Sequence, residues 1–173
     1  MDVEAKRKLL VKTKRGLDAA IVIVEGKRDE RALRETLAPT AETVKAGGRS
    51  ADAVARRAIE AVEEENKEEK EDKEKRKRIV VLTDFDAEGE RRAAEITEAL
   101  VAEGVAPDAS LRRNFARLFG VRCVEAAPTA LERLEDALEK RRFERNTVKK
   151  EKNKKKKKTK NEKREAKNKR EKQ

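Results

Sequence analysis

The chain has 173 residues, of which 48% are charged and 36% hydrophobic, so we expect one domain with extensions, a modest core and a highly charged surface. It contains no histidine, which excludes Ser–His–Asp and Cys–His catalytic sites and histidine-ligated metal sites. Cys123 is its only cysteine, which excludes an internal disulfide and a cysteine-based zinc cluster.

Residues 1–18 are expected to form an N-terminal helix. Leu9 and Leu10 supply an apolar stripe and Gly16 is a candidate stop signal, so we expect this helix to pack on the edge of a sheet. The segment lacks the apolar core of a secretion signal, and no run of the sequence approaches the roughly 20 apolar residues of a membrane span. A cytoplasmic protein without membrane contact is therefore expected.

Residues 19–145 alternate between strand and helix patterns, which predicts one α/β domain. Short apolar runs rich in β-branched residues predict the strands, and helical spacing of apolar residues predicts the segments between them. The predicted strands are Ala20–Val24, Glu42–Ala46, Ile79–Thr83 and Val121–Ala126, and the predicted helices span about residues 29–37, 50–62, 87–103, 111–119 and 129–143. This order predicts a sheet of about four strands, mostly parallel, with helices on both faces.

A charged segment, residues 63–78, interrupts this alternation. It contains eight acidic and seven basic residues and no apolar residue. Exposed ion pairs of this kind each contribute only about a few tenths of a kcal/mol. The segment is therefore expected to be a solvated helical extension or a disordered loop, with an arm that docks a partner as the alternative.

The last segment, residues 146–173, is rich in lysine and almost free of apolar residues. From residue 149 onwards it holds fifteen basic and four acidic residues, which accounts for the whole formal net charge of +11. Such a segment cannot bury enough surface to offset its ordering entropy, so we expect disorder or a frayed helix. A disordered cationic tail binds polyanions by counterion release. A solubilising tail without a partner is the alternative.

Two aspartates follow the third predicted strand, in the stretch TDFDAEGE. In an extended backbone Asp84 and Asp86 point the same way and Phe85 the opposite way, while Glu88 follows in the next turn. Clustered carboxylates are hard oxygen ligands at a spacing that suits Mg²⁺ or Mn²⁺. The alternative is an acidic loop in which Asp86 only caps the following helix.

The first predicted strand ends in a similar way, in the stretch VEGKRD. Glu25 follows this strand directly, and Gly26 comes next. Functional groups of parallel α/β sheets gather at the carboxyl ends of the strands. We therefore expect Glu25, Asp84 and Asp86 to converge on one crevice, although nearly 60 positions separate Glu25 from the two aspartates.

Together, the VEGxxD stretch after one strand and the TDFDAEGE stretch after another resemble the Toprim domain. This is the catalytic module of type IA and type II topoisomerases, bacterial primase, overcoming-lysogenization-defect nucleases and small nucleases that mature 5S ribosomal RNA. The resemblance covers about residues 20–127 and includes the Arg112–Arg113 pair and the segment VRCVEAAP. It implies a Toprim fold, and in length the chain looks most like the small archaeal Toprim proteins.

The resemblance also implies roles for the acidic residues. It implies a general acid or base role for Glu25 and binding of Mg²⁺ or Mn²⁺ by Asp84 and Asp86, with Glu88 nearby. Nuclease members of the family also use the aspartate that matches Asp29, for which an ordinary first-turn acid is the alternative. Tyrosine is absent, so the chain cannot by itself form the phosphotyrosyl intermediate of a topoisomerase.

Basic residues beside these acids, and in the tail, are candidate phosphate contacts. Those in the domain are as consistent with solvated surface charges. The candidate nucleic-acid-binding residues are Lys27, Arg28, Arg49, Arg91, Arg92, Arg112, Arg113, Lys154, Lys155, Lys156, Lys157 and Lys158. The tail resembles the lysine-rich extensions of ribosomal proteins, which favours structured RNA over DNA as the partner.

The sequence therefore predicts a metal-dependent nuclease, a hydrolase of phosphodiesters, that acts on structured RNA such as ribosomal RNA precursors. The alternative is a non-catalytic factor that binds ribosomal RNA, the ribosome or DNA, with the domain as scaffold and the tail as anchor. Few aromatic residues are present to stack bases, which favours this alternative or an enzyme that needs a protein partner. Primase activity is a third interpretation, but no sign of its zinc and helicase-contact modules is found in the sequence.

Overall fold

A computed structural model of the chain describes residues 3–68, 77–141 and 143. The chain divides into two compact units, Met1–Leu134 and Glu135–Gln173. Residues 127–134 of the first unit are helical, and so are residues 135–141 and 143 of the second. The predicted tail, residues 146–173, lies outside the described residues, as do residues 69–76 of the predicted charged segment.

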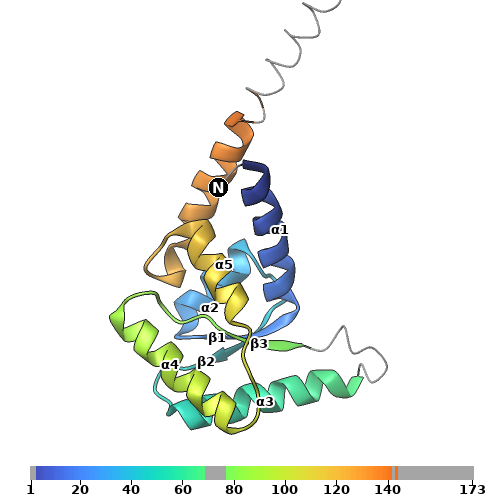
Figure 1. Ribbon diagram of the computed structural model, residues 1–173, viewed down its shortest axis with the longest axis vertical. Helices are drawn as coiled ribbons and strands as arrows, with labels where there is room; N and C mark the ends of the chain where they lie inside the picture. The colour runs from blue at the N-terminus through green and yellow to red at the C-terminus, as the bar shows by residue number, and fades with distance from the viewer. Residues whose placement is uncertain (1–2, 69–76, 142, 144–173) are drawn as a thin grey trace, which may run out of the picture. The chain divides into compact units, whose positions relative to one another are not determined.

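The first unit is built on a parallel sheet of three strands in the order β2-β1-β3 (Figure 1). Both outer strands run parallel to β1, with Ile21 of β1 opposite Glu42 of β2 and Ile79 of β3. The predicted α/β fold with a parallel sheet is therefore confirmed. In chain order the elements are α1 (Val3–Asp18), β1 (Ala20–Val24), α2 (Lys27–Thr36), β2 (Glu42–Lys45), α3 (Ala51–Glu68), β3 (Arg78–Val81), α4 (Ala87–Ala102), α5 (Ala109–Phe119) and the 3₁₀ helix η2 (Val124–Ala126).

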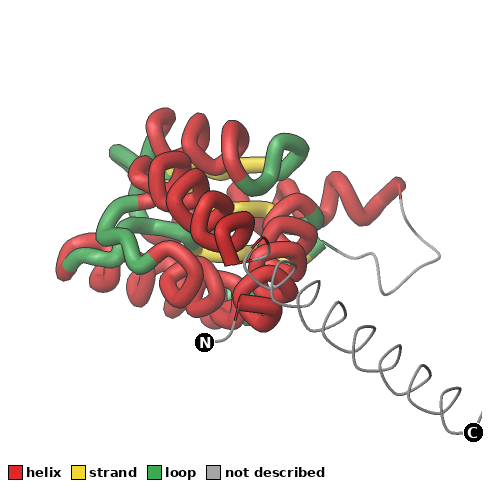
Figure 2. Tube along the Cα trace, turned by 90° about the horizontal axis from the view of Figure 1, so that it is seen from above, coloured by secondary structure: helices red, strands yellow, loops and turns green. Residues whose placement is uncertain are grey.

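The central strand β1 is buried along its whole length because helices cover both of its faces. Its sequence AIVIV is apolar and mostly β-branched, as is typical of a covered parallel strand. Ile21 and Ile23 belong to the core that the sheet forms with α3 and α4. Alternation directs Ala20, Val22 and Val24 to the opposite face, where α1, α2 and α5 lie. Figure 2 shows the strands between helices.

Helices α3 and α4 pack against each other and against one face of the sheet. Small side chains such as Ala55 and Ala58 of α3 allow the helices to approach closely, and Ile96 and Leu100 of α4 fill the space between them and the strands. Beyond this core α3 continues to Glu68. The first part of the predicted charged segment, residues 63–68, is therefore helical.

Helix α1 lies on the other face, against α5 and the central strand β1. A methyl group on Gly16 would come within 2.6 Å of a methyl carbon of Leu111 in α5, so glycine leaves room for that side chain. The predicted N-terminal helix is confirmed over Val3–Asp18, but Gly16 does not end it, because α1 continues to Asp18. The predicted place at the edge of the sheet is wrong too, since α1 contacts the middle strand.

The prediction of a fourth strand at Val121–Ala126 is also wrong. Val124–Ala126 forms a 3₁₀ helix, and Gly120, in the left-handed conformation at φ 61°, ends α5 directly before the segment. The segment bonds to the loop after β3 and not to a strand: the Arg122 carbonyl accepts from the Phe85 amide at 2.7 Å, and the Val124 amide donates to an Asp84 carboxylate oxygen at 2.8 Å. Its apolar residues therefore cover the end of the sheet without extending it.

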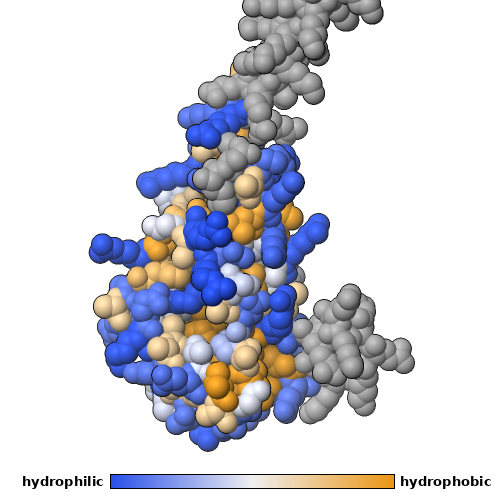
Figure 3. All heavy atoms as spheres, viewed as in Figure 1, coloured by the Kyte–Doolittle hydropathy of each residue, from blue (hydrophilic) through white to orange (hydrophobic). Residues whose placement is uncertain are grey.

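Charged residues lie mostly on the surface, as the composition predicts. In the part of the chain that is described, Val11, Val101 and Phe143 are the large hydrophobic residues that are exposed. Figure 3 shows one face, on which hydrophilic side chains project between hydrophobic patches. No helix within residues 3–68 and 77–141 is long and apolar enough to cross a membrane.

Asp108 fixes the connection between α4 and α5. Its amide donates to the Ile79 carbonyl of β3 at 2.8 Å. Its carboxylate caps α5 by accepting from the Ser110 amide at 2.8 Å and from the Ser110 hydroxyl, and it also pairs with Arg78 at 2.9 Å. One aspartate thus joins the edge strand to the start of a helix.

We expect Asp108→Ala to destabilise the protein by about 1 kcal/mol at pH 7, because it removes a helix cap. Burial opposes ionisation of this carboxyl group, but the hydrogen bonds from Ser110 and the charge of Arg78 outweigh burial and lower the pKa of Asp108. A carboxylate with a lowered folded-state pKa stabilises the fold above its unfolded-state pKa, and this contribution is lost as the pH falls through the folded-state value. The difference in unfolding free energy between wild type and variant, measured with urea, should therefore shrink below about pH 4.

Asp108→Asn is the matched control, because asparagine caps helices about as well as aspartate. It should keep most of the stability at pH 7. If it destabilised the protein as much as Asp108→Ala does, the charge of Asp108 and not its capping hydrogen bonds would carry the effect.

Candidate active site

Acidic residues follow β1 and β3, which are neighbours in the sheet. The chain leaves β1 towards β2 on one side, while β3 lies on the other side, so the carboxyl ends of β1 and β3 flank the switch point at which open α/β sheets bind ligands. At this point Glu25 Oε1 accepts a hydrogen bond from the Asp84 amide at 3.2 Å. The structure thus brings together two acidic residues that are 59 positions apart in the sequence.

Arg112 of α5 holds the loop that carries Asp84. Its guanidinium donates to the Thr83 carbonyl at 2.7 Å and to the Asp84 carbonyl at 2.9 Å, and it lies 4.4 Å from the centre of the Phe85 ring. On the other side of the loop, Asp84 Oδ1 accepts from the Val124 amide at 2.8 Å. The backbone and the carboxylate of Asp84 are therefore both fixed by hydrogen bonds.

These contacts give Arg112 a different role from the predicted phosphate contact. Its side chain is only 14% exposed, and besides the backbone carbonyls it pairs with Glu90 at 2.9 Å. We therefore describe Arg112 as a positioning residue for the Asp84 loop. Arg113 is exposed, without an ion pair to any described residue. Phosphate binding by these two arginines stays a prediction.

Asp86 is the N-cap of α4, as one of the two sequence interpretations predicts. Its Oδ1 accepts from the Gly89 amide at 2.8 Å. The Gly89 carbonyl in turn accepts from the Thr83 hydroxyl at 2.8 Å, so the first turn of α4 is joined to the end of β3. A side chain at position 89 would collide with the Asp84 backbone, and only glycine permits this approach. The cap leaves the second oxygen of Asp86 without a hydrogen bond to a described residue.

Burial and mutual repulsion raise the pKa of two carboxyl groups at this site. Burial makes the largest contribution for Glu25, and its neighbours Asp84, Asp29 and Asp86 raise its pKa further. Asp29 is 8% exposed; burial again contributes most to its raised pKa, followed among the raising causes by Asp84 and Glu125. In both residues a backbone hydrogen bond acts in the opposite direction; Asp29 Oδ2 accepts from the Gly26 amide at 2.9 Å.

Glu125 is an acidic residue of this site that sequence reasoning missed. It lies in η2, directly after Val124, whose amide bonds to Asp84, and its charge acts on Asp29. The segment was expected to be a strand in the sheet, which would place its residues away from the loop. The hydrogen bond between the Val124 amide and Asp84 brings η2, and with it Glu125, to the site.

A hollow of 350 Å³ adjoins Glu25. The turn at Gly47 forms one wall: the Gly47 amide donates to the Glu25 carbonyl at 2.8 Å, and a side chain at Gly47 would lie 2.9 Å from that oxygen. The predicted phosphate ligands Arg49, Arg91 and Arg92 and the predicted metal ligand Glu88 line the hollow, whereas Lys27, Arg28, Asp84 and Asp86 do not.

The arginines of the hollow differ in their contacts. Arg92 donates to the Ala46 carbonyl at 3.2 Å and also to the Arg49 carbonyl, so it holds the turn in place. Arg91 is exposed and pairs with Glu95 on its own helix at 2.5 Å. The Arg49 guanidinium donates to the Lys45 carbonyl at 2.6 Å and is exposed as well. Arg49 and Arg91 therefore have more freedom to meet a ligand than Arg92 does.

The carboxylates at the end of the sheet have the chemistry of a magnesium site. Glu25, Asp84 and Asp86 each use one oxygen to accept from a backbone amide and keep the other for a further partner. Among the residues that the structure describes, no group of three or more acidic, histidine or cysteine side chains is placed to hold a metal ion. Mg²⁺ usually binds through one or two carboxylates, with water and substrate phosphates as its other ligands. Asp84 and Asp86 fit that mode of binding.

A parallel sheet with acidic residues at its switch point defines a doubly wound α/β domain with a polar ligand site. The Toprim domain family matches residues 20–118, more than half of the chain, and the chain belongs to this family, as the sequence motifs predict. Toprim domains typically bind Mg²⁺ and serve metal-dependent chemistry on nucleic acids or nucleic-acid binding.

A solved structure of a protein from Aquifex aeolicus is similar to 69% of this chain and to 94% of its own chain, with 23% sequence identity and a TM-score of 0.49. No curated protein sequence matches the chain.

We expect Gly89→Ala to destabilise the fold by about 1–3 kcal/mol, because its methyl group would lie within 2.6 Å of the Asp84 carbonyl carbon. Elsewhere in a helix the same substitution stabilises by about 0.5–1 kcal/mol. Unfolding in urea measures the change. Gly26→Ala is the control, because the nearest atom to its methyl group, an Asp29 oxygen, is 3.9 Å away. Equal stability of the two variants would contradict the steric role of Gly89.

Proposed function

We propose that this Toprim protein is a Mg²⁺-dependent nuclease that hydrolyses phosphodiester bonds in structured RNA, such as ribosomal RNA precursors. The contact between Glu25 and the Asp84 amide at the switch point is the observation that carries the proposal. Acidic groups that face one another are unfavourable unless a cation or a proton reduces their repulsion. A protein that only binds a polyanion has no physical need for such a group.

Different acidic residues take different roles in this proposal. Asp84 and Asp86 hold the metal ion, which when bound polarises a phosphodiester and stabilises the negative charge that develops during cleavage. Glu25 accepts the proton of the attacking water or donates one to the leaving oxygen. The Asp84 amide orients the Glu25 carboxylate through Oε1, and Oε2 is the atom that exchanges the proton. Asp29 adds negative charge beside Asp84.

The substrate contacts are assigned to the exposed basic residues near the acids. Arg49 and Arg91 stand at the hollow beside Glu25, where a phosphate of the bound strand offsets their charge. Lys27 and Arg28 are exposed in the first turn of α2, directly after Glu25 and Gly26. The lysine-rich tail adds sequence-independent attraction to a polyanion, which supports RNA as the substrate class.

One observation favours the alternative, a non-catalytic factor that binds ribosomal RNA, the ribosome or DNA. In residues 3–68 and 77–141 no three acidic side chains are placed together to hold a metal ion. In this alternative the domain is a scaffold and the tail is the anchor. Binding would then depend on the tail and would be insensitive to changes at Asp84 and Asp86.

Cleavage assays distinguish the two functions. Labelled precursor ribosomal RNA, duplex DNA and single-stranded DNA are incubated with the protein in Mg²⁺, Mn²⁺ or EDTA. We expect discrete RNA products in Mg²⁺ that disappear in EDTA and in the double variant Asp84→Asn/Asp86→Asn, because the metal ligands are lost. Glu25→Gln should reduce the rate by about 10²–10⁴-fold, as expected for the loss of a general acid or base.

Glu98→Gln is the matched control, since it removes one carboxylate from an exposed position of α4. It should cleave at the wild-type rate. Metal-dependent cleavage that persists in the aspartate double variant would contradict the assignment of Asp84 and Asp86 as the metal ligands. Tight binding without cleavage in any metal, equal in wild type and double variant, would support the binding factor instead.

A further inference from the structure

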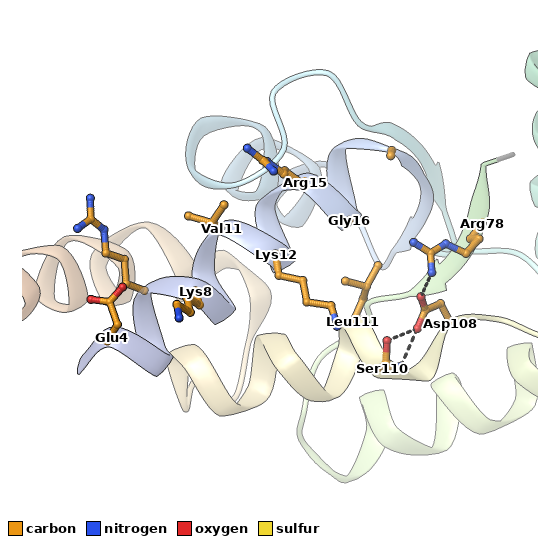
Figure 4. Close-up of a pocket in the computed structure, with 12 residues that line it drawn as sticks. Glu4, Lys8, Val11, Lys12, Arg15, Gly16, Arg78, Asp108, Ser110 and Leu111 are labelled. Carbon is orange, nitrogen blue, oxygen red and sulfur yellow. Dashed lines mark hydrogen bonds and ion pairs between the residues drawn. The ribbon is translucent and has the colours of Figure 1, made fainter. Parts of the chain in front are cut away.

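A basic pocket lies between α1 and the start of α5 (Figure 4). It is at the amino ends of the strands, whereas Glu25 and Asp84 follow their carboxyl ends. Ala19 and Arg78, which line it, stand at the amino ends of the parallel strands β1 and β3. Its volume is 650 Å³. Its basic lining residues are Arg7, Lys8, Lys12 and Arg15 of α1 together with Arg78, and its acidic lining residues are Glu4 and Asp108.

Four of these cations are not neutralised within the described part of the chain. The side chains of Arg7, Lys8, Lys12 and Arg15 are exposed and form no ion pair or hydrogen bond with a described residue. Arg78, by contrast, pairs with Asp108, which Figure 4 shows beside Ser110. The unpaired positive charge of the basic pocket therefore comes from one helix.

The spacing of the cations on α1 places three of them in a row along the helix. Lys8, Lys12 and Arg15 are four and three positions apart, so they lie on one face of the helix. At 1.5 Å per residue, Lys8 and Arg15 are separated by about 10 Å along the axis. One strand of a duplex carries a phosphate about every 3.4 Å along its axis, so this row is as long as about three phosphate spacings.

The row of like charges carries an energetic disadvantage in the isolated protein. Like charges at positions i and i+4 repel one another and destabilise a helix. Helix α1 contains six basic and two acidic residues, while residues 1–148 as a whole carry no formal net charge. A bound polyanion would reverse this repulsion, whereas a small neutral ligand would not.

Apolar residues also line the basic pocket. Gly16 lies against Leu111, and Val11 is 44% exposed between the cations. Figure 4 shows Lys12 extended towards Leu111, so its aliphatic stem covers this apolar lining while its ammonium group remains available. Such a surface accepts the sugar-phosphate backbone of a strand and offers no aromatic platform for a base.

We propose that the basic pocket binds the phosphodiester backbone of a nucleic-acid duplex and is a second contact for the substrate of the acidic site. The proposal rests on the proposed function, because it takes the nucleic-acid substrate of the acidic site as its ligand. The family match begins at residue 20 and does not include α1. Because β1 has five residues, its amino and carboxyl ends are about 17 Å apart. A duplex that contacts both the basic pocket and the acidic site must therefore be longer than about five base pairs.

Binding measurements in EDTA test this proposal without any need for cleavage. The full chain is titrated onto fluorescent 20-base-pair RNA and DNA duplexes at several salt concentrations. Lys12→Gln/Arg15→Gln should lower the affinity at least about tenfold at 0.1 M salt, because two phosphate contacts are lost. The slope of log affinity against log salt should become less steep by about 2. Both side chains are exposed, so a melting temperature near that of the wild type is expected.

The matched control is Arg56→Gln/Arg57→Gln, which removes the same charge from two exposed positions of α3. Equal affinity and equal slope in the pocket variant and this control would overturn the proposal. A competition experiment with a mononucleotide gives a second way to overturn the proposal. If the mononucleotide displaced the duplex from the wild-type protein and not from the pocket variant, the pocket would be a site for single nucleotides and not for a duplex backbone. A changed slope in a protein that cleaves no substrate would support the basic pocket and reject the nuclease function.

Discussion

The position of the Asp84 backbone is the constraint on which the candidate active site depends. Helix α4 begins so close to it that Gly89 has no space for a side chain. From α5, the Arg112 guanidinium reaches the carbonyls of Thr83 and Asp84 and covers the ring of Phe85. Hydrogen bonds from a charged donor are stronger than neutral ones, so this contact holds a loop that has no strand partner of its own. The Asp84 loop is therefore positioned by contacts with two helices, α4 and α5.

Hydrogen bonds from backbone amides to the carboxylates explain how acidic groups coexist at this place. Glu25, Asp84 and Asp86 each accept from a backbone amide, which partly offsets the burial and the repulsion of the charged forms. They face one another across two strand ends and do not surround a point, in agreement with the missing group of three ligands among the described residues. A cation at Asp84 and Asp86 would be incomplete without water and phosphate oxygens, which suits a site that must exchange substrate.

Local sequence patterns predicted what depends on local structure, and failed where distant segments meet. The β-branched runs gave β1 to β3, and the position of Asp86 before a helical run gave its cap, because both follow from backbone geometry. Gly16 looked like a helix stop because its contact with α5 is a tertiary one. The contacts of Arg112 with the Asp84 loop were not predicted, because its partners Thr83 and Asp84 lie about 30 positions earlier. Glu125 was not predicted as a site residue, because the bond between its neighbour Val124 and Asp84 spans 40 positions. An apolar run such as Val121–Ala126 does not show whether it will pair with a strand or cover the end of a sheet.

Formal neutrality of the first 148 residues hides a separation of charge. Carboxylates gather at the carboxyl ends of the strands, and the unpaired cations of α1 gather near the amino ends. Acidic residues repel a polyanion, so a site built from them needs attraction from elsewhere to bring a phosphodiester to it. At physiological salt, the attraction exerted by an exposed charge is largely screened beyond the Debye length of roughly 8 Å. In the proposed function, attraction must therefore come from several places along the substrate, and the basic pocket is proposed as one of them.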